Sequence, residues 1–212
     1  MTQKGETIAR RERALERLIS ITDDVFAFAI TLLVLDLTVP TLTSTATSAD
    51  LWAALKDQYV TFLDYALSFL IAGAWWTSHN RNFEKLNGAD GTLRWLNLLF
   101  LLWIALLPFF TKLLSDFIIL QLALDLYAGD QVAAGLFMTL IWWYATKNHR
   151  LVDRSLPDST VRTTLLLDAG TTLWFVLSIC VSFVSLAVTV YMWLGVFPAH
   201  RLMHYIWRDP MK

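Results

Sequence analysis

The chain has 212 residues, of which 56% are hydrophobic and 10 are tryptophan, and its mean hydropathy is +0.50. A soluble domain of this length needs less apolar surface, so the composition indicates an integral membrane protein. A formal net charge of -1 provides no basic surface for nucleic acid. The single cysteine, Cys180, excludes an intramolecular disulfide and a cysteine-rich metal site.

Six hydrophobic segments are long enough to cross the hydrocarbon layer, which takes a helix of roughly 20 residues. They are 18–39, 57–79, 95–115, 126–147, 163–183 and 186–206. The first segment follows basic residues, as in a signal peptide, but its end lacks a small-residue cleavage pattern, so we interpret it as a retained helix. The last two segments are separated only at Ser182 and Ser185, and five crossings are an alternative.

The distribution of Lys and Arg predicts the orientation of the chain. The N-terminal tail, the 80–94 loop, the 147–162 loop and the C-terminal end contain 5, 3, 4 and 3 of them, which is 15 of the 17. Cytoplasmic loops of membrane proteins carry such an excess. We therefore expect both termini in the cytoplasm and the chain in the cell membrane. Five crossings would leave the basic C-terminal end outside, so residues 1–212 are predicted to form one all-α domain with six transmembrane helices.

Polar residues gather in the first turns of the first span, where Arg17, Thr22, Asp23 and Asp24 precede an uncharged stretch. Ionisable groups at membrane depth are costly and usually have a partner or face a water-filled path. One interpretation places these acids among the lipid headgroups, in contact with water. The other is a polar cluster between helices.

Partners for such a cluster are available on the second and third spans, whose ends reach the same membrane face as the start of the first. The candidate hydrogen-bond donors toward Thr22 or Asp23 are Trp76, His79 and Asn97. Arg17 would complete this network. An interfacial tryptophan or histidine alone is more often explained by anchoring at the membrane surface.

The segment Arg17-x-x-x-Ile21-Thr22-Asp23 and the helix that follows it resemble the Arg-x-x-x-Phe-Ser-Asp signature and first helix of the transmembrane protein 175 family. That family comprises endosomal and lysosomal potassium channels and their bacterial relatives. The similarity extends through 68–79 and 96–108, and so covers the first half of the chain. Ile21 and Thr22 depart from the signature but keep the apolar bulk and the hydroxyl, and Asn80 stands where a second histidine commonly follows His79.

The resemblance implies a homotetramer of six-helix subunits around a central pore that the first helix lines. The family's pore positions correspond to Phe28, Thr31 and Leu35, with Leu32 beside them in the same constriction. Positions 28, 31 and 35 share one helix face, and four copies would form a hydrophobic constriction that acts as gate and filter. On the residues alone, lipid contact or helix packing is the more common explanation for such a stripe.

The candidate classes of function are a passive potassium channel, a secondary transporter and a membrane enzyme. A transporter is expected to show inverted repeats and acids at the span centres, whereas Asp125 and Asp168 lie near span ends, which predicts interfacial positions. No His-Glu-x-x-His or Gly-x-Ser-x-Gly motif occurs, so no catalytic residue, cofactor or resident metal is predicted. We expect a homotetrameric potassium channel whose partners are transiently bound potassium ions, the lipid bilayer and its own copies; the alternative is a secondary transporter.

Overall fold

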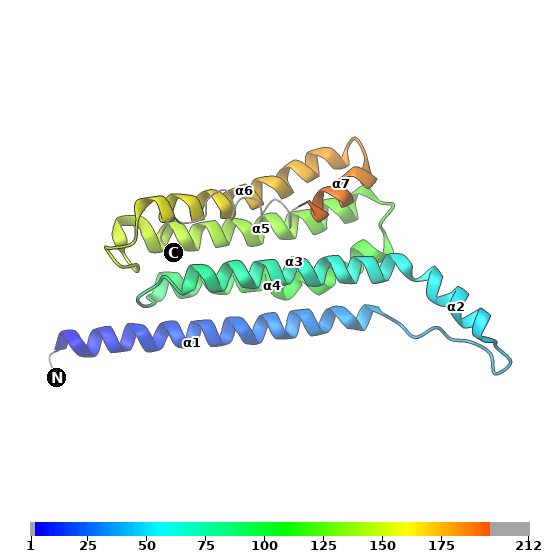
Figure 1. Cartoon of the computed structure of the whole chain (residues 1–212), viewed down its shortest axis with the longest axis horizontal. Coiled ribbons are helices and arrows are strands. Elements are labelled where there is room, and N and C mark those ends of the chain that lie inside the picture. The colour runs from blue at the N-terminus through cyan, green and yellow to red at the C-terminus, as the bar shows by residue number, and fades with distance from the viewer. Residues whose placement is uncertain (1–2, 196–212) are drawn as a thin grey trace.

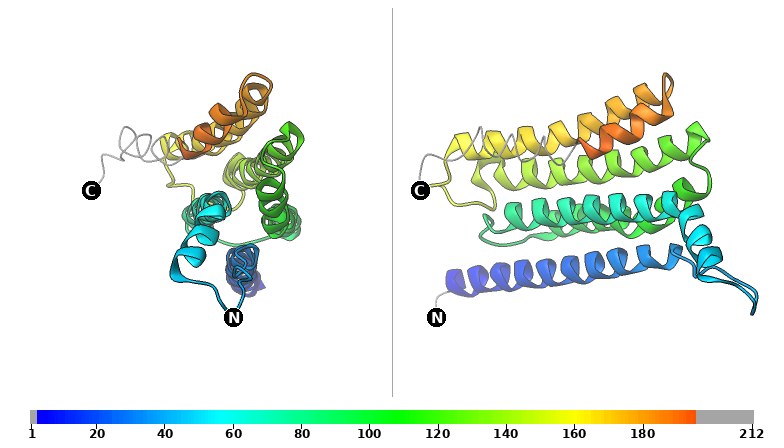
Figure 2. Two further views of the ribbon diagram at one scale, coloured as in Figure 1. Left: turned by 90° about the vertical axis from the view of Figure 1, so that its right-hand side faces the viewer. Right: turned by 45° about the vertical axis from the view of Figure 1, so that its right-hand side comes forward.

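The computed structural model describes residues 3–195, and in this range long helices run along one common axis (Figure 1). The first, α1 (Gln3–Leu32), continues into a 3-10 turn at Leu33–Asp36. Its buried residues recur every three or four positions and form one stripe. They are Leu15, Leu18, Thr22, Phe26, Ala29 and Leu33. The stripe packs against α3 and α4, which leaves α1 at one edge of the molecule (Figures 1 and 2).

A short helix, α2 (Ser48–Asp57), separates α1 from the next long helix and lies apart from the bundle (Figure 1). Thr47 and Asp50 form a reciprocal capping box, in which the Thr47 amide donates to Asp50 Oδ2 at 2.7 Å. The backbone and side-chain hydrogen bonds from Thr47 lower the pKa of the Asp50 carboxyl. The second crossing was predicted to begin at residue 57, whereas the structure ends α2 at Asp57 and begins α3 (Tyr59–Phe83) at Tyr59.

The remaining helices follow in up-and-down order and pack mainly against their neighbours in the chain. They are α4 (Gly91–Asp116), α5 (Gln121–Thr146), α6 (Asp158–Ser182) and α7 (Leu186–Leu194). α4 contacts α1, α3 and α5, and α7 packs against both α6 and α5. The end-on view in Figure 2 shows α1 and α6 on opposite sides of this arrangement.

Four helices in the described range have the length and hydropathy of a bilayer crossing: Ala9–Asp36, Tyr59–Phe83, Gly91–Asp116 and Asp158–Ser182. The helix α5 is equally long, at 26 residues, but contains polar residues such as Asp130 and Gln131, which are buried against other helices. A helix inside a bundle can carry such residues because its neighbours, rather than lipid, meet them.

The predicted last crossing, 186–206, is described only in its first part, α7; residues 196–206 lie outside the described residues. The chain reverses direction at Phe183–Ser185, and the Val188 amide donates to Ser185 Oγ at 3.4 Å at the start of α7. The indole of Trp193 on α7 donates to Ser178 Oγ on α6 at 3.0 Å. The serines between the fifth and sixth predicted segments therefore mark a turn between two antiparallel helices (Figure 1).

The start of α1 and the connections α3–α4 and α5–α6 lie at the same end of the molecule (Figure 1). The Ala89 amide donates to the Arg11 carbonyl at 3.1 Å, and the Asn87 amide donates to the Leu151 carbonyl at 2.8 Å. A side chain at Gly88 would come within 2.8 Å of Arg11 Cβ, so only glycine permits this close approach of the loop to α1. These contacts join the start of α1, the α3–α4 connection and the α5–α6 connection at the end where the basic loops lie.

Candidate functional site

A buried chain of hydrogen bonds connects α1, α4 and α3. The Thr22 hydroxyl donates to the Leu18 carbonyl at 2.8 Å and accepts a hydrogen bond from Asn97 Nδ2 at 2.9 Å. Asn97 Oδ1 lies 2.8 Å from His79 Nε2, and this pairing requires the proton on Nε2 because an amide oxygen only accepts. Thr22, His79 and Asn97 are fully buried. A polar group in this environment is costly to leave unpaired, so the chain of hydrogen bonds fixes the three helices in register.

The imidazole of His79 is held on both sides by aromatic rings. Its centroid lies 3.7 Å from that of Phe83 and 5.6 Å from that of Phe100, in stacked arrangements. These rings leave the His79 ring little room to rotate. The orientation of its Nε2–H toward Asn97 therefore follows from packing as well as from the hydrogen bond.

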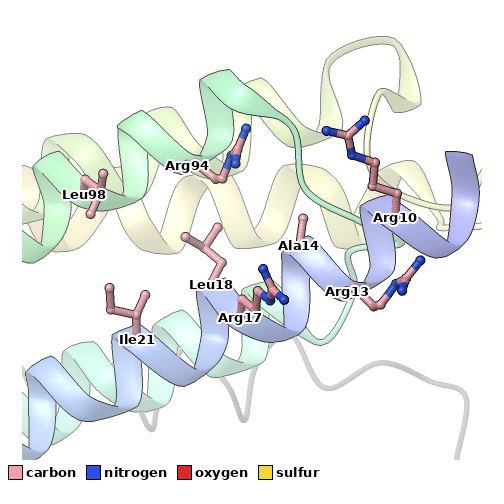
Figure 3. A pocket seen from close by; sticks show the side chains of 8 residues that line it. All are labelled: Arg10, Arg13, Ala14, Arg17, Leu18, Ile21, Arg94 and Leu98. Carbon is pink, nitrogen blue, oxygen red and sulfur yellow. The ribbon is translucent and has the colours of Figure 1, made fainter.

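Of the other three candidate network residues, Asp23 and Trp76 pair with each other nearer the surface. The indole of Trp76 donates to Asp23 Oδ1 at 2.8 Å, and Trp76 is 42% exposed. Arg17 is not brought to this pair within the described chain. It is exposed and lines a separate hollow with Arg10, Arg13 and Arg94 (Figure 3).

The candidate pore residues are exposed, three of them on α1 and Leu35 in the 3-10 turn that continues it. Phe28 is 71% exposed and Leu35 is 70% exposed, while Leu32 is 43% exposed and Thr31 is also exposed. The Thr31 hydroxyl donates to the Ala27 and Phe28 carbonyls, at 2.9 Å each. Its hydrogen is thus used within the helix, and the oxygen lone pairs are left on the outer face as acceptors.

Of the two acids expected at interfacial positions, Asp125 is half-buried and accepts a hydrogen bond from Ser182 Oγ at 2.6 Å, whereas Asp168 is buried. Asp168 is 1% exposed rather than interfacial, because it points into the bundle and accepts a hydrogen bond from Asn82 Nδ2 at 2.8 Å. Its other oxygen lies 3.9 Å from Arg81 Nη2. Distance from a span end describes depth along the helix but not the direction of the side chain, and this is why the sequence interpretation of Asp168 was wrong.

Further buried polar groups lie on the face of α3 that carries Asn82. Ser68 Oγ lies 3.0 Å from the Tyr127 hydroxyl, and the Trp75 indole donates to Gln131 Oε1 at 2.8 Å. Gln131 in turn donates to Asp130 at 2.8 Å. The signal for this in the sequence is the spacing of polar residues on one face of α3. The buried members of that face are Asp64, Ser68, Trp75, Ser78 and Asn82.

Comparison with known proteins identifies the family to which the chain belongs. The family model described as endosomal/lysosomal potassium channel TMEM175 matches residues 17–108, which contain the buried network and the exposed face of α1. A potassium channel of Streptomyces collinus is 32% identical over 178 residues, which cover 82% of this chain and 85% of that protein. The chain belongs to the TMEM175 family.

Other members of the TMEM175 family match over shorter stretches. A potassium channel of Chamaesiphon minutus is 31% identical over 64% of this chain and 68% of its own length. The endosomal/lysosomal proton channel TMEM175 of Mus musculus is 33% identical over 98 residues, which are 46% of this chain and 20% of that protein.

The fold is likewise that of TMEM175 proteins. The crystal structure of a lysosomal potassium-selective channel TMEM175 homolog from Chamaesiphon minutus superposes with a TM-score of 0.75, at 23% identity, over 92% of this chain and 98% of that one. This likeness extends beyond residue 108, into the helices where the family model finds no match.

Proposed function

We propose that the chain is one subunit of a homotetrameric potassium channel in the cell membrane, with six crossings, cytoplasmic termini and a pore lined by α1. The observation that carries this proposal is the exposed side of α1 and of the 3-10 turn that continues it. Phe28 and Leu35 are large apolar side chains there, and about 70% of the surface of each is exposed. One chain with one such helix cannot enclose a pore, so a closed ring of copies is required. The names of the bacterial relatives support potassium as the ion.

The buried network supports the same assignment because it anchors the opposite side of α1. Thr22 and Phe26 face α3 and α4 and are fully buried, which fixes the rotation of α1 about its own axis. The positions that point outward are then fixed as well. Phe28 and Thr31 are held on the outward face of α1, and the exposed Leu35 follows in the 3-10 turn that continues it.

The chemistry of this face suits a hydrophobic gate with a weak polar ring. Four copies of Phe28 and Leu35 would exclude water from a narrow pore and so block ions until the helices separate. Four Thr31 oxygens, each with its lone pairs turned outward, would offer acceptors to a partly dehydrated cation. Apolar rings cannot replace a full hydration shell, so the preference for potassium follows from its lower cost of losing water and is expected to be modest.

The test is a flux assay on protein reconstituted in liposomes that carry a potassium gradient. Wild-type protein should pass potassium faster than sodium, and Phe28→Ala should increase the resting flux because it shortens the largest side chain of the constriction. Phe109→Ala is the matched control, since Phe109 is 60% exposed but lies on α4. Equal flux in wild type and Phe28→Ala would show that Phe28 does not line the pore.

A secondary transporter is the second candidate, and the burial of Asp64, Asp130 and Asp168 favours it. Carboxylates inside a helix bundle are the groups that proton-coupled carriers use. The same liposomes with a pH-sensitive dye inside distinguish the two. Passive potassium flux that does not require a pH gradient supports the channel, whereas potassium movement that occurs only with proton movement, and is unchanged by Phe28→Ala, supports the carrier.

A further inference from the structure

The short helix α2 has an apolar side that its own chain leaves uncovered. Leu51 and Trp52 are 42% and 62% exposed, and Leu55 follows one turn later on the same side of the helix. No residue of α2 is buried within the described chain. The capping box of Thr47 and Asp50 nevertheless fixes the start of the helix. Neighbouring apolar side chains exposed on an ordered helix mark a surface that interacts with something else.

The position of α2 makes the acyl chains of lipid an unsuitable cover for this side. The helix lies at the end of the molecule opposite the basic loops, and Figure 1 shows it extending past the ends of the long helices. Those helices are the ones that cross the hydrocarbon layer, so α2 lies at the depth of headgroups and water. An indole suits the headgroup region, whereas Leu51 and Leu55 need an apolar cover, which protein provides at this depth.

An apolar groove lies at the connection between α4 and α5, at the same end of the molecule as α2 (Figure 1). Its volume is about 160 Å³, and a cavity of about 150 Å³ is large enough to hold a benzene molecule. The groove therefore has room for part of an aromatic side chain. All of its lining side chains are apolar: Leu113, Phe117, Leu120, Leu122, Ala123 and Leu126.

The groove and α2 lie on different flanks of one chain. The end-on view in Figure 2 shows α2, in cyan, on the left and the α4–α5 connection, in green, on the right. A contact between two different surfaces of identical chains is heterologous, and rotation about an axis closes it into a ring in which each copy gives one surface and receives the other. The pore proposed above requires a closed ring of this kind.

We propose that α2 of each subunit docks into the α4–α5 groove of a neighbouring copy, with Trp52 as the anchor and Leu51 and Leu55 beside it. The proposal rests on the proposed function, from which it takes the ring of copies. Tryptophan is the side chain type that most often anchors a protein interface by filling an apolar pocket. Because both surfaces lie beside α1 and not on its exposed side, the contact would keep the subunits joined while the α1 helices separate.

The experiment is disulfide cross-linking of the full chain, reconstituted in liposomes, in a Cys180→Ser background. The test variant carries Trp52→Cys and Leu120→Cys, two positions that are exposed within the chain. The matched control carries Ala53→Cys and Leu120→Cys, because Ala53 is exposed on the opposite side of α2. Native mass spectrometry of the unoxidised protein measures the oligomeric state separately.

We expect oxidation to convert the test variant into linked dimers, trimers and tetramers at multiples of the 24.2 kDa chain mass, while the control stays mostly monomeric. The reason is that a disulfide requires Cα atoms within about 7 Å. A link within one chain, or no link in protein of intact tetrameric mass, would overturn the docking and leave the proposed function standing. Products that stop at the dimer would mean a reciprocal pair and would also overturn it. A mass below that of a tetramer would overturn the ring itself, and the docking with it.

Discussion

Asn97 on α4 links α1 and α3 through buried hydrogen bonds, because its amide group contacts Thr22 on one side and His79 on the other. We expect Asn97→Leu, which keeps the size of the side chain, to destabilise the protein by about 1–3 kcal/mol, since it leaves a buried imidazole N–H without an acceptor. In a chain of this length that corresponds to roughly 2–4 °C of thermal midpoint for each kcal/mol. Thermal unfolding in detergent measures it.

The control for this prediction is Trp76→Phe. It removes the hydrogen bond to Asp23, but Trp76 is 42% exposed and water can replace its N–H at the carboxylate. The loss should therefore be about 0.5 kcal/mol or less. A larger loss in Trp76→Phe than in Asn97→Leu would mean that the surface pair, and not the buried chain, anchors α1.

Individual residues show which side-chain contacts can be predicted from composition and spacing. The clustering of polar groups at one end of the first three spans is visible in the sequence, and in the structure Asn97 reaches Thr22 and Trp76 reaches Asp23. The position of Arg17 could not be obtained in this way, because an arginine side chain is long enough to reach several partners. The burial of Asp168 was missed because its partner, Asn82, lies 86 positions away in the chain.

At the scale of the elements, the close packing of α5 on α6 depends on Gly135. A Cβ at this position would collide with the Thr172 hydroxyl, which is already bonded to the Asp168 carbonyl at 2.9 Å, and would lie 3.1 Å from the Trp75 ring. Small residues allow transmembrane helices to approach in this manner. We expect Gly135→Ala to destabilise the protein by about 1–3 kcal/mol through overpacking, measured by thermal unfolding in detergent.

Gly129 provides the matched control on the same helix. Nothing lies within 4 Å of a Cβ built there, so Gly129→Ala should be neutral or stabilise by about 0.5–1 kcal/mol, as alanine does in a helix interior. Equal destabilisation by the two variants would show that α5 depends on glycine for backbone flexibility and not for contact with α6.

The boundaries of the helices were predictable to the extent that hydropathy determines them. The segments 95–115 and 163–183 fall within or close to α4 and α6. Both helices start before the apolar stretch: Asp90 caps α4 by accepting from the Leu93 amide, and α6 begins at Asp158. The helix α2 was not predicted because it has no buried residue in the described chain, so no apolar periodicity marks it. Its signal in the sequence is the Thr47–Asp50 capping box at its start.

For the whole molecule, the sequence predicts in which direction each helix crosses the membrane. It does not predict which exposed surface faces lipid and which faces other copies of the chain. Charge in the loops places the start of α1, the α3–α4 connection and the α5–α6 connection on one side, and in the structure all three lie at one end (Figure 1). Phe28 and the exposed Leu177 of α6, however, are both apolar side chains on the outside of one chain. Only an assembly of copies can separate a pore-facing surface from a lipid-facing one.

Cysteine cross-linking makes that separation measurable. In a Cys180→Ser background, Leu35→Cys should form disulfide-linked dimers when the reconstituted protein is oxidised, because four α1 helices around an axis would bring the position-35 side chains of different copies together. A disulfide requires Cα atoms within about 7 Å.

Leu177→Cys is the control, since Leu177 is 47% exposed but α6 and α1 lie on opposite sides of the chain (Figure 2). Native mass spectrometry of the same samples should give four times the 24.2 kDa chain mass. Cross-linking that favours Leu177→Cys would place α6, and not α1, at the axis, and the exposed face of α1 would then be a surface that meets lipid.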